Sequence, residues 1–266
     1  MISVAVTGAA GRMGSRILRL LSEDKEFQIV GATEREDHPR VGWDAGQAAG
    51  IGNIGVRLST VIEDAAASAD GIIDFTTPEA SLDVAQYAAE TGKAVVIGTT
   101  GFSPEQVVLL RSLAEHFPCV YSPNMSVGVN VMFKVAGFLA KLLGEGYDIE
   151  VMEIHHRHKV DAPSGTALGL AEAVCSALSW DTTGVLRFER HGKVGERRSD
   201  EIGVQALRGG DVVGEHTVYF LGSGERIELT HRATSRDNFA AGALRALKWV
   251  VGKPPGLYSM KDVLGI

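Results

Sequence analysis

Apolar and polar positions alternate along the first 125 residues in a pattern typical of buried strands followed by helices. Short apolar runs cover residues 2–6, 27–32, 71–75, 94–97 and 119–121. Each run ends in a polar or glycine-containing turn, and amphipathic stretches with helical spacing separate the runs. This order predicts an α/β fold with a Rossmann-like, doubly wound parallel sheet. In such sheets ligands bind outside the carboxyl ends of the strands.

The pattern changes beyond residue 126. A long apolar helix is predicted over residues 129–143, then a strand over 149–154 and a helix over 167–178. Segments within 185–231 alternate and are separated by glycine pairs at 209–210 and at 222 and 224, which predicts antiparallel strands joined by hairpin turns. Residues 238–251 form another amphipathic helix, which we expect to pack against the first domain. The predicted domains are therefore 1–126 with 238–266, and 127–237.

Composition and charge limit the classes of protein. The chain has 266 residues, of which 45% are hydrophobic and 22% charged, as in ordinary soluble proteins. Its net charge of −7 argues against a general nucleic-acid binder or a binder of anionic membranes. The first residues lack the features of a signal peptide, and no run of 18 apolar residues predicts a membrane span. The only two cysteines, Cys119 and Cys175, fit buried free thiols in a reducing cytoplasm.

A glycine loop follows the first predicted strand directly. Gly8, Gly11 and Gly14 form a G-x-x-G-x-x-G pattern, and Glu34 ends the next predicted strand, 20 residues after Gly14. A dinucleotide site needs such glycines near the pyrophosphate and an acidic residue at the ribose. Glu34 suits the ribose hydroxyl of NADH, whereas Arg35 and Arg12 suit the additional phosphate of NADPH. The alternative is a tight turn with a structural role only.

A basic run, Glu153-Ile-His-His-Arg-His-Lys-Val-Asp-Ala-Pro-Ser-Gly-Thr166, stands out against the acidic background. Histidine titrates near neutrality, lysine is a compact proton donor, and the Ser-Gly-Thr turn offers backbone N–H groups at a predicted helix start. The run is therefore suited to hold an anion and to give it a proton. Two alternatives are a solvated basic loop and a zinc site. Adjacent histidines on an extended chain diverge, and no cysteine completes a set of four zinc ligands.

Four segments together resemble one known family. They are Gly8-Ala-Ala-Gly-Arg-Met-Gly14, Asp74-Phe75-Thr76, Gly98-Thr-Thr-Gly101 and the basic run, and in this order they resemble dihydrodipicolinate reductase. The resemblance implies reduction of 4-hydroxy-tetrahydrodipicolinate, a cyclic dicarboxylate, by NADH or NADPH in the cytoplasm, on the route to diaminopimelate and lysine. It also implies a dinucleotide-binding domain in two pieces. Between them would lie a substrate-binding α+β domain with an open mixed sheet that assembles a homotetramer, with no nucleic-acid or membrane partner and no metal.

The resemblance also assigns roles to residues. It makes His155 the acid–base residue and Lys159 the proton donor, while His156, Gly165 and Thr166 hold the substrate. The cofactor-binding positions that it implies are Gly8, Ala9, Ala10, Gly11, Arg12, Met13, Glu34, Arg35, Gly98, Thr99, Thr100, Ser122, Pro123, Asn124 and Met125. Met125 departs from the family pattern, in which an aromatic residue is more usual. A flexible apolar side chain is expected to preserve packing there.

Two other functions remain compatible with a dinucleotide domain. One is a redox sensor that binds NAD(P) without turnover, and the other is a sugar or amino-acid dehydrogenase with the same two-domain plan. Lys159 beside paired histidines argues against the sensor, because a sensor needs no proton donor. The remaining polar residues are given structural roles: His38 and His116 are expected to be solvated, and residues 231–232 and 236–238 to serve as a hinge or interface.

Overall fold

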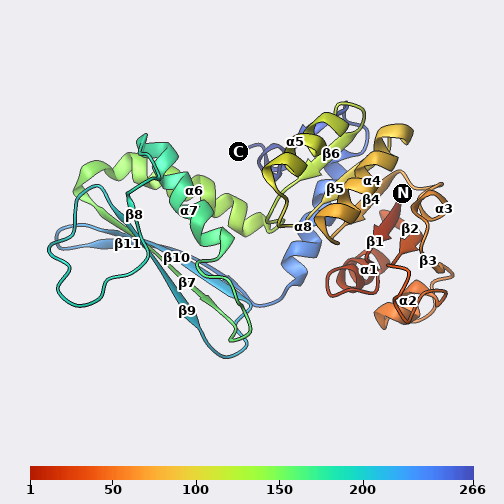
Figure 1. Cartoon of the computed structure of the whole chain (residues 1–266), viewed down its shortest axis with the longest axis horizontal. Coiled ribbons are helices and arrows are strands. Elements are labelled where there is room, and N and C mark those ends of the chain that lie inside the picture. Colours follow the sequence, from red (N-terminus) through yellow and green to blue (C-terminus); the bar gives the residue numbers. More distant parts are fainter. The chain divides into compact units, whose positions relative to one another are not determined.

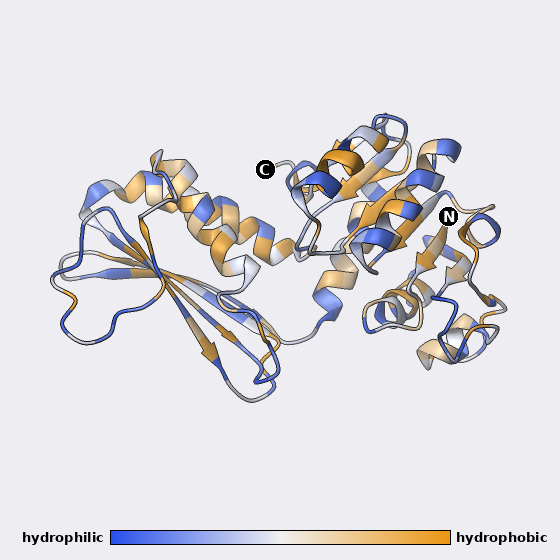
Figure 2. Cartoon of the chain, in the orientation of Figure 1, coloured by the Kyte–Doolittle hydropathy of each residue, from blue (hydrophilic) through white to orange (hydrophobic).

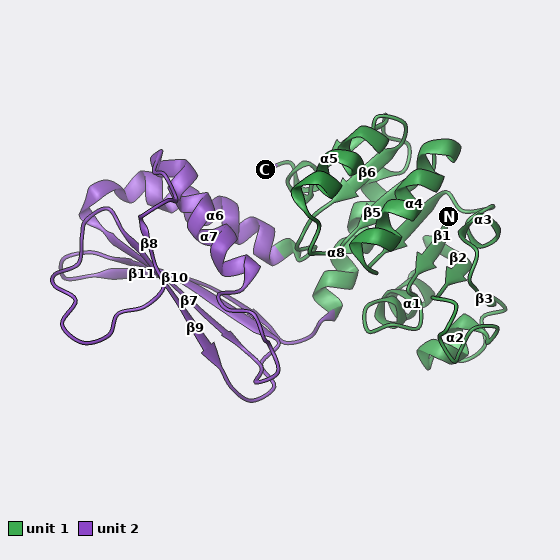
Figure 3. Cartoon of the chain, viewed as in Figure 1, with its two compact units in different colours: residues 1–127, 237–265 green, residues 128–236, 266 purple.

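The computed structural model describes residues 1–266, which form two compact units (Figures 1 and 3). Unit 1 comprises Met1–Val127 and Asp237–Gly265, and unit 2 comprises Gly128–Arg236 with Ile266. The chain thus leaves unit 1, builds unit 2 and returns to unit 1 for its last helices.

Unit 1 is built on a parallel seven-stranded sheet with the order β12-β6-β5-β4-β1-β2-β3. The strands are β1 (Ile2–Thr7), β2 (Phe27–Thr33), β3 (Leu58–Ser59), β4 (Gly71–Asp74), β5 (Ala94–Ile97), β6 (Pro118–Tyr121) and β12 (Gly256–Tyr258). The helices are α1 (Gly14–Glu23), α2 (Ala45–Ala49), α3 (Ile62–Ala65), α4 (Pro78–Thr91), α5 (Pro104–Leu113), α8 (Asp237–Val250) and α9 (Met260–Leu264). The predicted doubly wound parallel sheet is confirmed, and the five predicted strands end within one residue of their observed bounds.

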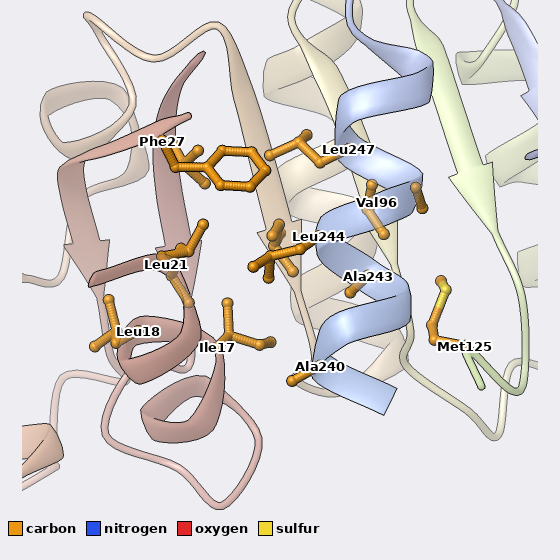
Figure 4. Packing of buried hydrophobic residues seen from close by; sticks show 14 of the residues in the cluster. Ile17, Leu18, Leu21, Phe27, Val96, Met125, Ala240, Ala243, Leu244 and Leu247 are labelled. Atoms are coloured by element: carbon orange, nitrogen blue, oxygen red, sulfur yellow. The ribbon is translucent and has the colours of Figure 1, made fainter. Parts of the chain in front are cut away.

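Helices cover both faces of this sheet because neighbouring strand residues point to opposite sides. Val4 and Val6 pack in a core with α1 and α8, whereas Ala5 between them packs in a second core with α4 and α5. Ile73 and Ile72 divide between the two cores in the same way. Figure 4 shows the first core, in which α1 and α8 face each other across buried leucines. Burial of each such side chain contributes about 1.5–3 kcal/mol.

The strand order places a switch point between β1 and β4. The chain proceeds from β1 to β2 on one side, and β4 then joins the other side of β1. Loops that follow β1 and β4 therefore run in opposite directions, and in such sheets ligands bind at the carboxyl ends of the strands at this point. The glycine loop after β1 and the Asp74-Phe75-Thr76 segment at the end of β4 both belong to this edge.

The helix starts of unit 1 follow sequence signals. Ser103 caps α5 in a capping box with Gln106, and Pro104 occupies the first helical position. Thr77 caps α4 by accepting a hydrogen bond from the Ala80 N–H, with Pro78 at the first helical position. These caps hold the first turns of helices that begin at the ligand edge of the sheet.

Unit 2 contains a mixed five-stranded sheet with the order β11-β10-β7-β9-β8. The strands are β7 (Asp148–His155), β8 (Leu186–Arg187), β9 (Ile202–Arg208), β10 (Gly214–Leu221) and β11 (Arg226–Ala233), and the helices are α6 (Val127–Leu143), α7 (Gly165–Leu178) and the short 3-10 helix Gly144–Gly146. The predicted mixed sheet is confirmed, and so is the hairpin between β10 and β11. The hairpin predicted at residues 209–211 is wrong, because β7 lies between β9 and β10 and pairs with β9 in parallel.

Helices α6 and α7 cover one face of the mixed sheet (Figures 1 and 2). Their apolar side chains share a core with alternate residues of β7, β9 and β10. At Gly137 an added Cβ would lie 2.9 Å from the carbonyl oxygen of Ala173, so the glycine allows close packing of α6 on α7. By length and composition alone, the segment Val127–Gly146 is apolar enough to cross a membrane, as core helices of soluble proteins also are.

Candidate active site

The glycine loop is a tight turn that only small residues permit. Gly8 has a φ of 60°, in the left-handed region, and Gly11 donates a backbone hydrogen bond to the Gly8 carbonyl oxygen at 2.9 Å. A Cβ at Gly14 would lie 2.1 Å from that same oxygen. Helix α1 therefore begins against the end of β1, which is what the backbone of a pyrophosphate cradle requires. The loop geometry fits a dinucleotide.

Glu34 lies directly after β2 and is anchored to the glycine loop. Its Oε2 accepts a hydrogen bond from the Ala10 N–H at 3.0 Å, and its Oε1 accepts one from the Arg35 N–H at 3.1 Å. The Arg35 guanidinium lies 3.3 Å from Asp37, and both side chains are exposed. The Glu34 carboxylate is thus held in place, and the exposed guanidinium group of Arg35 belongs to the next residue. This pair suits both the ribose hydroxyl and the phosphate that distinguishes NADPH.

Asp74 ties the ends of three neighbouring strands together. Its carboxylate is fully buried and accepts hydrogen bonds from Thr7 at 2.5 Å, Thr76 at 2.7 Å, Thr99 at 3.0 Å and the Ser81 hydroxyl. Four donors compensate for the loss of water around a buried charge. In the sequence, Asp74 stands out only as part of a family motif. The four hydroxyl groups around it could not be predicted to cluster, because their residues are scattered along the chain.

The remaining predicted cofactor positions follow β5 and β6. Gly98 must be glycine, because a Cβ there would lie 2.2 Å from the ring of Phe75. The Ser122 hydroxyl donates to the Asn124 carbonyl oxygen at 2.9 Å and closes the turn after β6. The Met125 side chain is buried beside α8 in the core of unit 1 (Figure 4). At this position the side chain serves packing, and the backbone forms the turn.

The mixed sheet of unit 2 carries a polar row at one end of its helix-covered face. Glu153 and His155 lie two residues apart on β7 and so share that face with the apolar core. Strand register adds two partners, because His216 of β10 pairs with Glu153 and Arg208 of β9 pairs with His155. On each of these strands, an ionisable residue therefore lies on the same face as the apolar residues that face the helices.

Glu153 is the centre of this row. Its carboxylate is fully buried, with Oε2 2.6 Å from His155 Nδ1, and it accepts two hydrogen bonds from Arg208 at 2.7 and 2.8 Å. Burial raises the pKa of the Glu153 carboxyl, but the hydrogen bonds from Arg208, His155 and the Ser164 N–H outweigh burial and hold that pKa below its usual value. For His155, burial lowers the pKa of the imidazole more than the Glu153 carboxylate raises it. His155 is thus held neutral in the resting protein.

Two predicted site residues, His156 and Lys159, follow β7 within the basic run. His156 makes a backbone hydrogen bond to Val212, and its Nε2 accepts a hydrogen bond from Arg236 Nη2 at 3.4 Å. The Lys159 Nζ lies 2.8 Å from both carboxylate oxygens of Asp161. For Arg236 the sequence alone favoured a hinge or interface role; the structure adds a guanidinium to the predicted substrate residues. The contact between Arg236 and His156 could not be predicted from the sequence, because the two residues lie far apart along the chain.

The predicted anion cradle begins at Ser164. The Ser164 hydroxyl caps α7 by accepting a hydrogen bond from the Ala167 N–H at 3.1 Å, and it also lies 2.9 Å from His216 Nε2. Gly165 and Thr166 form the first turn of the helix, where backbone N–H groups favour an anion. An added Cβ at Gly165 would meet nothing within 4 Å. The space above the helix start is therefore open.

The structure gives no support to the zinc alternative. No group of three or more His, Cys, Asp or Glu side chains is placed to hold a metal ion. His155 uses its Nδ1 on Glu153, and His158 is exposed.

Comparisons with known proteins decide the family. Family models of dihydrodipicolinate reductase match the chain twice, the N-terminal model over residues 2–125 and the C-terminal model over residues 128–264. The chain belongs to the dihydrodipicolinate reductase family. Among curated members, the 4-hydroxy-tetrahydrodipicolinate reductase of Citrifermentans bemidjiense is 53% identical over all 266 residues of this chain and 100% of its own length. That of an Anaeromyxobacter species is 54% identical, covering 100% of this chain and 98% of the relative.

Solved structures agree on the fold. A dipicolinate-bound dihydrodipicolinate reductase from Paenisporosarcina sp. aligns with a TM-score of 0.76 at 24% identity and covers 98% of each chain. An amine dehydrogenase from Mycobacterium smegmatis aligns with a TM-score of 0.62 at 16% identity, over 97% of this chain and 95% of that one. The fold is therefore shared with an amine dehydrogenase.

Proposed function

We propose that this chain reduces 4-hydroxy-tetrahydrodipicolinate to tetrahydrodipicolinate with NADH or NADPH, in the pathway to diaminopimelate and lysine. Membership of the reductase family over the whole length supports this function. The single structural observation that carries it is the Glu153–His155 pair with Lys159 four residues further on and a capped helix start at Ser164. A proton source and an anion cradle therefore lie on one short stretch of chain.

Unit 1 is the dinucleotide-binding domain in this proposal. The close approach of Gly14 to Gly8 and the Glu34 carboxylate on the loop fit a dinucleotide. The bound nicotinamide supplies the hydride. Residues 8–13, 34–35, 98–100 and 122–125 hold the cofactor, with the backbone N–H groups of the glycine loop toward the pyrophosphate and Glu34 toward the ribose.

Unit 2 binds the substrate and supplies the proton. The two substrate carboxylates pair with the N–H groups and hydroxyl of Gly165 and Thr166 and with the side chains of His156 and Lys159. The 4-hydroxyl group first leaves the substrate as water, which gives a ring carbon–carbon double bond conjugated with the imine. Hydride addition to this double bond leaves negative charge on the ring, and a proton from Lys159 or His155 neutralises it. Release of Lys159 from Asp161 frees its ammonium group for this role.

The uncovered face of the mixed sheet fits the homotetramer that the family resemblance implies. Helices pack on one face only, and alternate residues of β7, β9 and β10 on the other face include Met152, Ile154, Leu207, Tyr219 and Leu221. Leu207 is 45% exposed and Leu221 is 37% exposed. In this proposal the tetramer works in the cytoplasm, where the buried Cys119 and Cys175 remain free thiols.

Replacement of Lys159 tests the proton donor. We expect Lys159→Ala to lower kcat by about 10²–10⁴-fold, the range for loss of a positioned acid, and to leave the Kd for NADH nearly unchanged. Lys193→Ala, which removes an exposed lysine of unit 2, is the matched control and should behave as wild type. Stopped-flow oxidation of NADH at saturating substrate gives kcat, and fluorescence titration gives Kd. Wild-type kcat in Lys159→Ala would remove Lys159 from the mechanism.

A further inference from the structure

The Glu153 carboxylate makes four hydrogen bonds in a site from which water is excluded. Oε2 lies 2.6 Å from His155 Nδ1 and 2.7 Å from Arg208 Nη1, and Oε1 lies 2.8 Å from Arg208 Nη2 and 2.9 Å from the Ser164 nitrogen. A buried carboxylate is costly unless its partners are charged and well placed. A side chain that only completed a core would be apolar here, so the four partners point to a specific task.

The first partner is the ring of His155. The Glu153 carboxylate accepts a hydrogen bond from Nδ1–H, which fixes the tautomer of the neutral ring and leaves Nε2 as the nitrogen that can take up or release a proton. Nε2 makes no hydrogen bond of its own and lies over Gly214 of the adjacent strand, where an added Cβ would be only 3.0 Å away. The ring therefore has one orientation, set from behind by the carboxylate.

The second partner is the start of α7. The Ser164 N–H donates to Glu153, and the Ser164 hydroxyl caps the helix by accepting from the Ala167 N–H. This bond anchors the residue immediately before Gly165 and Thr166. The Glu153 carboxylate thus fixes the position of the His155 ring relative to the start of α7, where the predicted anion cradle lies.

Arg208 provides the compensating charge and reaches a third segment. Besides its two bonds to Glu153, Arg208 Nη2 donates to the Asp161 carbonyl oxygen at 2.7 Å. Asp161 in turn pairs with Lys159 through its carboxylate. The loop that carries the predicted proton donor is therefore fastened to the same centre.

We propose that Glu153, with Arg208 as its counter-charge, is a positioning residue that orders His155, the start of α7 and the Lys159 loop into one catalytic arrangement. The proposal rests on the proposed function for the roles of these three groups. The orientation of His155 by Glu153 stands apart from that function and can be measured without turnover.

Several ionisable groups face His155, and their effects differ in sign. Burial lowers the pKa of His155, the Glu153 carboxylate on the same strand raises it, and Lys159 and Arg208 lower it. His216, from β10, contacts the ring edge to face with centroids 5.2 Å apart. Glu153 is the one group in this set that favours the protonated ring, so its neutralisation must lower the pKa of His155.

The test compares Glu153→Gln with wild type and with Glu215→Gln. Glu215 lies on β10 in a partly exposed ion pair with Arg232, which makes it a matched control for loss of a glutamate charge. NMR titration of the His155 Cε1–H signal, assigned by its absence in His155→Asn, gives the pKa. We expect a lower pKa in Glu153→Gln, a kcat reduced by about 10–100-fold, weaker binding of pyridine-2,6-dicarboxylate and an unchanged Kd for NADH.

Two further variants keep the test decisive. Glu153→Asp retains the charge and should keep the pKa of His155 closer to that of wild type than Glu153→Gln does. If Glu153→Gln fails to fold because Arg208 is left unpaired, Glu153→Gln with Arg208→Met removes both charges. The pKa of His155 should still be lower than in wild type, because the raising effect of Glu153 is larger than the lowering effect of Arg208. An unchanged His155 titration and an unchanged kcat in a folded variant would overturn the proposal. Failure of wild type to reduce the substrate would instead overturn the proposed function and leave the NMR result intact.

Discussion

At the residue scale, Glu34 and Arg35 are the residues that we propose distinguish the two cofactors. Glu34 is fixed by the Ala10 N–H, whereas the Arg35 guanidinium is exposed and pairs only with Asp37. Arg35 can therefore turn to a phosphate without disturbing the loop. The same pair of residues leaves room for the unphosphorylated ribose, on which Glu34 alone acts.

Arg35→Ala should therefore weaken the binding of NADPH more than the binding of NADH. Loss of one charge-assisted hydrogen bond costs about 1–3 kcal/mol, so we expect the Kd for NADPH to rise by roughly 5–150-fold and that for NADH to change little. Arg57→Ala, at another arginine of unit 1, serves as the control. Equal losses for both cofactors in a fluorescence titration would show that Arg35 does not contact the phosphate.

His216 should make folding stability depend on pH. Burial is the largest of several effects that lower the pKa of this imidazole to about 3. Between that value and the pKa near 6.5 of an unfolded histidine, the unfolded chain binds more protons than the folded one. Stability from the neutral ring is thus complete above pH ~6.5 and falls with decreasing pH, by up to about 1.4 kcal/mol per pH unit.

His216→Gln removes this titration and keeps a polar group near Ser164. We expect its free energy of unfolding to fall less steeply than that of wild type as the pH decreases from about 6.5 to 5. Urea unfolding at a series of pH values measures both slopes. The same pH dependence of unfolding free energy in both proteins would mean that folding does not lower the pKa of His216.

At the element scale, α8 fixes the turn that follows β6. An added Cβ at Gly242 would lie 1.8 Å from the Met125 carbonyl oxygen, so the helix lies directly against the predicted cofactor segment. Asp237 at the start of α8 also pairs with Arg16 at 2.6 Å and Arg19 at 2.7 Å, which joins α8 to α1. Helix α8, in the C-terminal piece of the chain, thus packs against the N-terminal piece of unit 1.

Gly242→Ala should destabilise the protein although alanine is the better helix former. Its gain of about 0.5–1 kcal/mol in helix propensity is smaller than the overpacking cost of about 1–3 kcal/mol. Gly146→Ala, where nothing lies within 4 Å of the added Cβ, is the control and should be neutral. Thermal unfolding compares the two variants, and an unchanged Tm in Gly242→Ala would contradict this account of the α8 contact.

The elements that sequence predicted well are those with local signals. Buried strands followed by turns and capped helices, such as α5 with its Ser103–Gln106 capping box, are encoded by neighbouring residues. The pairing of β9 was missed because apolar alternation is the same in parallel and antiparallel strands. The short elements β3, α2, α3, β12 and α9 were not predicted, since two to five residues carry little periodic signal.

The same reasoning applies to the candidate site. Glu153, His155 and Lys159 lie in one run and could be selected from the sequence. Arg208 and His216 could not, because their place beside Glu153 depends on the register of β9 and β10 with β7. Nothing near them in the sequence marks them as partners of the basic run.

At the scale of the whole molecule, the two units carry different parts of the proposed reaction. Unit 1, which is built from two pieces of chain, holds the predicted cofactor residues, and unit 2 holds the predicted acid–base residues and the predicted anion cradle. Neither set can reduce a ring imine alone, because one lacks the hydride donor and the other lacks the proton donor. The intact chain is therefore the active species.

Transfer of deuterium tests the central claim most directly. The protein is supplied with freshly generated 4-hydroxy-tetrahydrodipicolinate and with NADH that carries deuterium at the transferred C4 position, and the product is analysed by mass spectrometry. We predict tetrahydrodipicolinate with one deuterium on a ring carbon, formed in step with cofactor oxidation, and the same result with deuterated NADPH. Oxidation of the cofactor without deuterium in the ring, or no oxidation with this substrate while a sugar or amino acid supports it, would contradict the account.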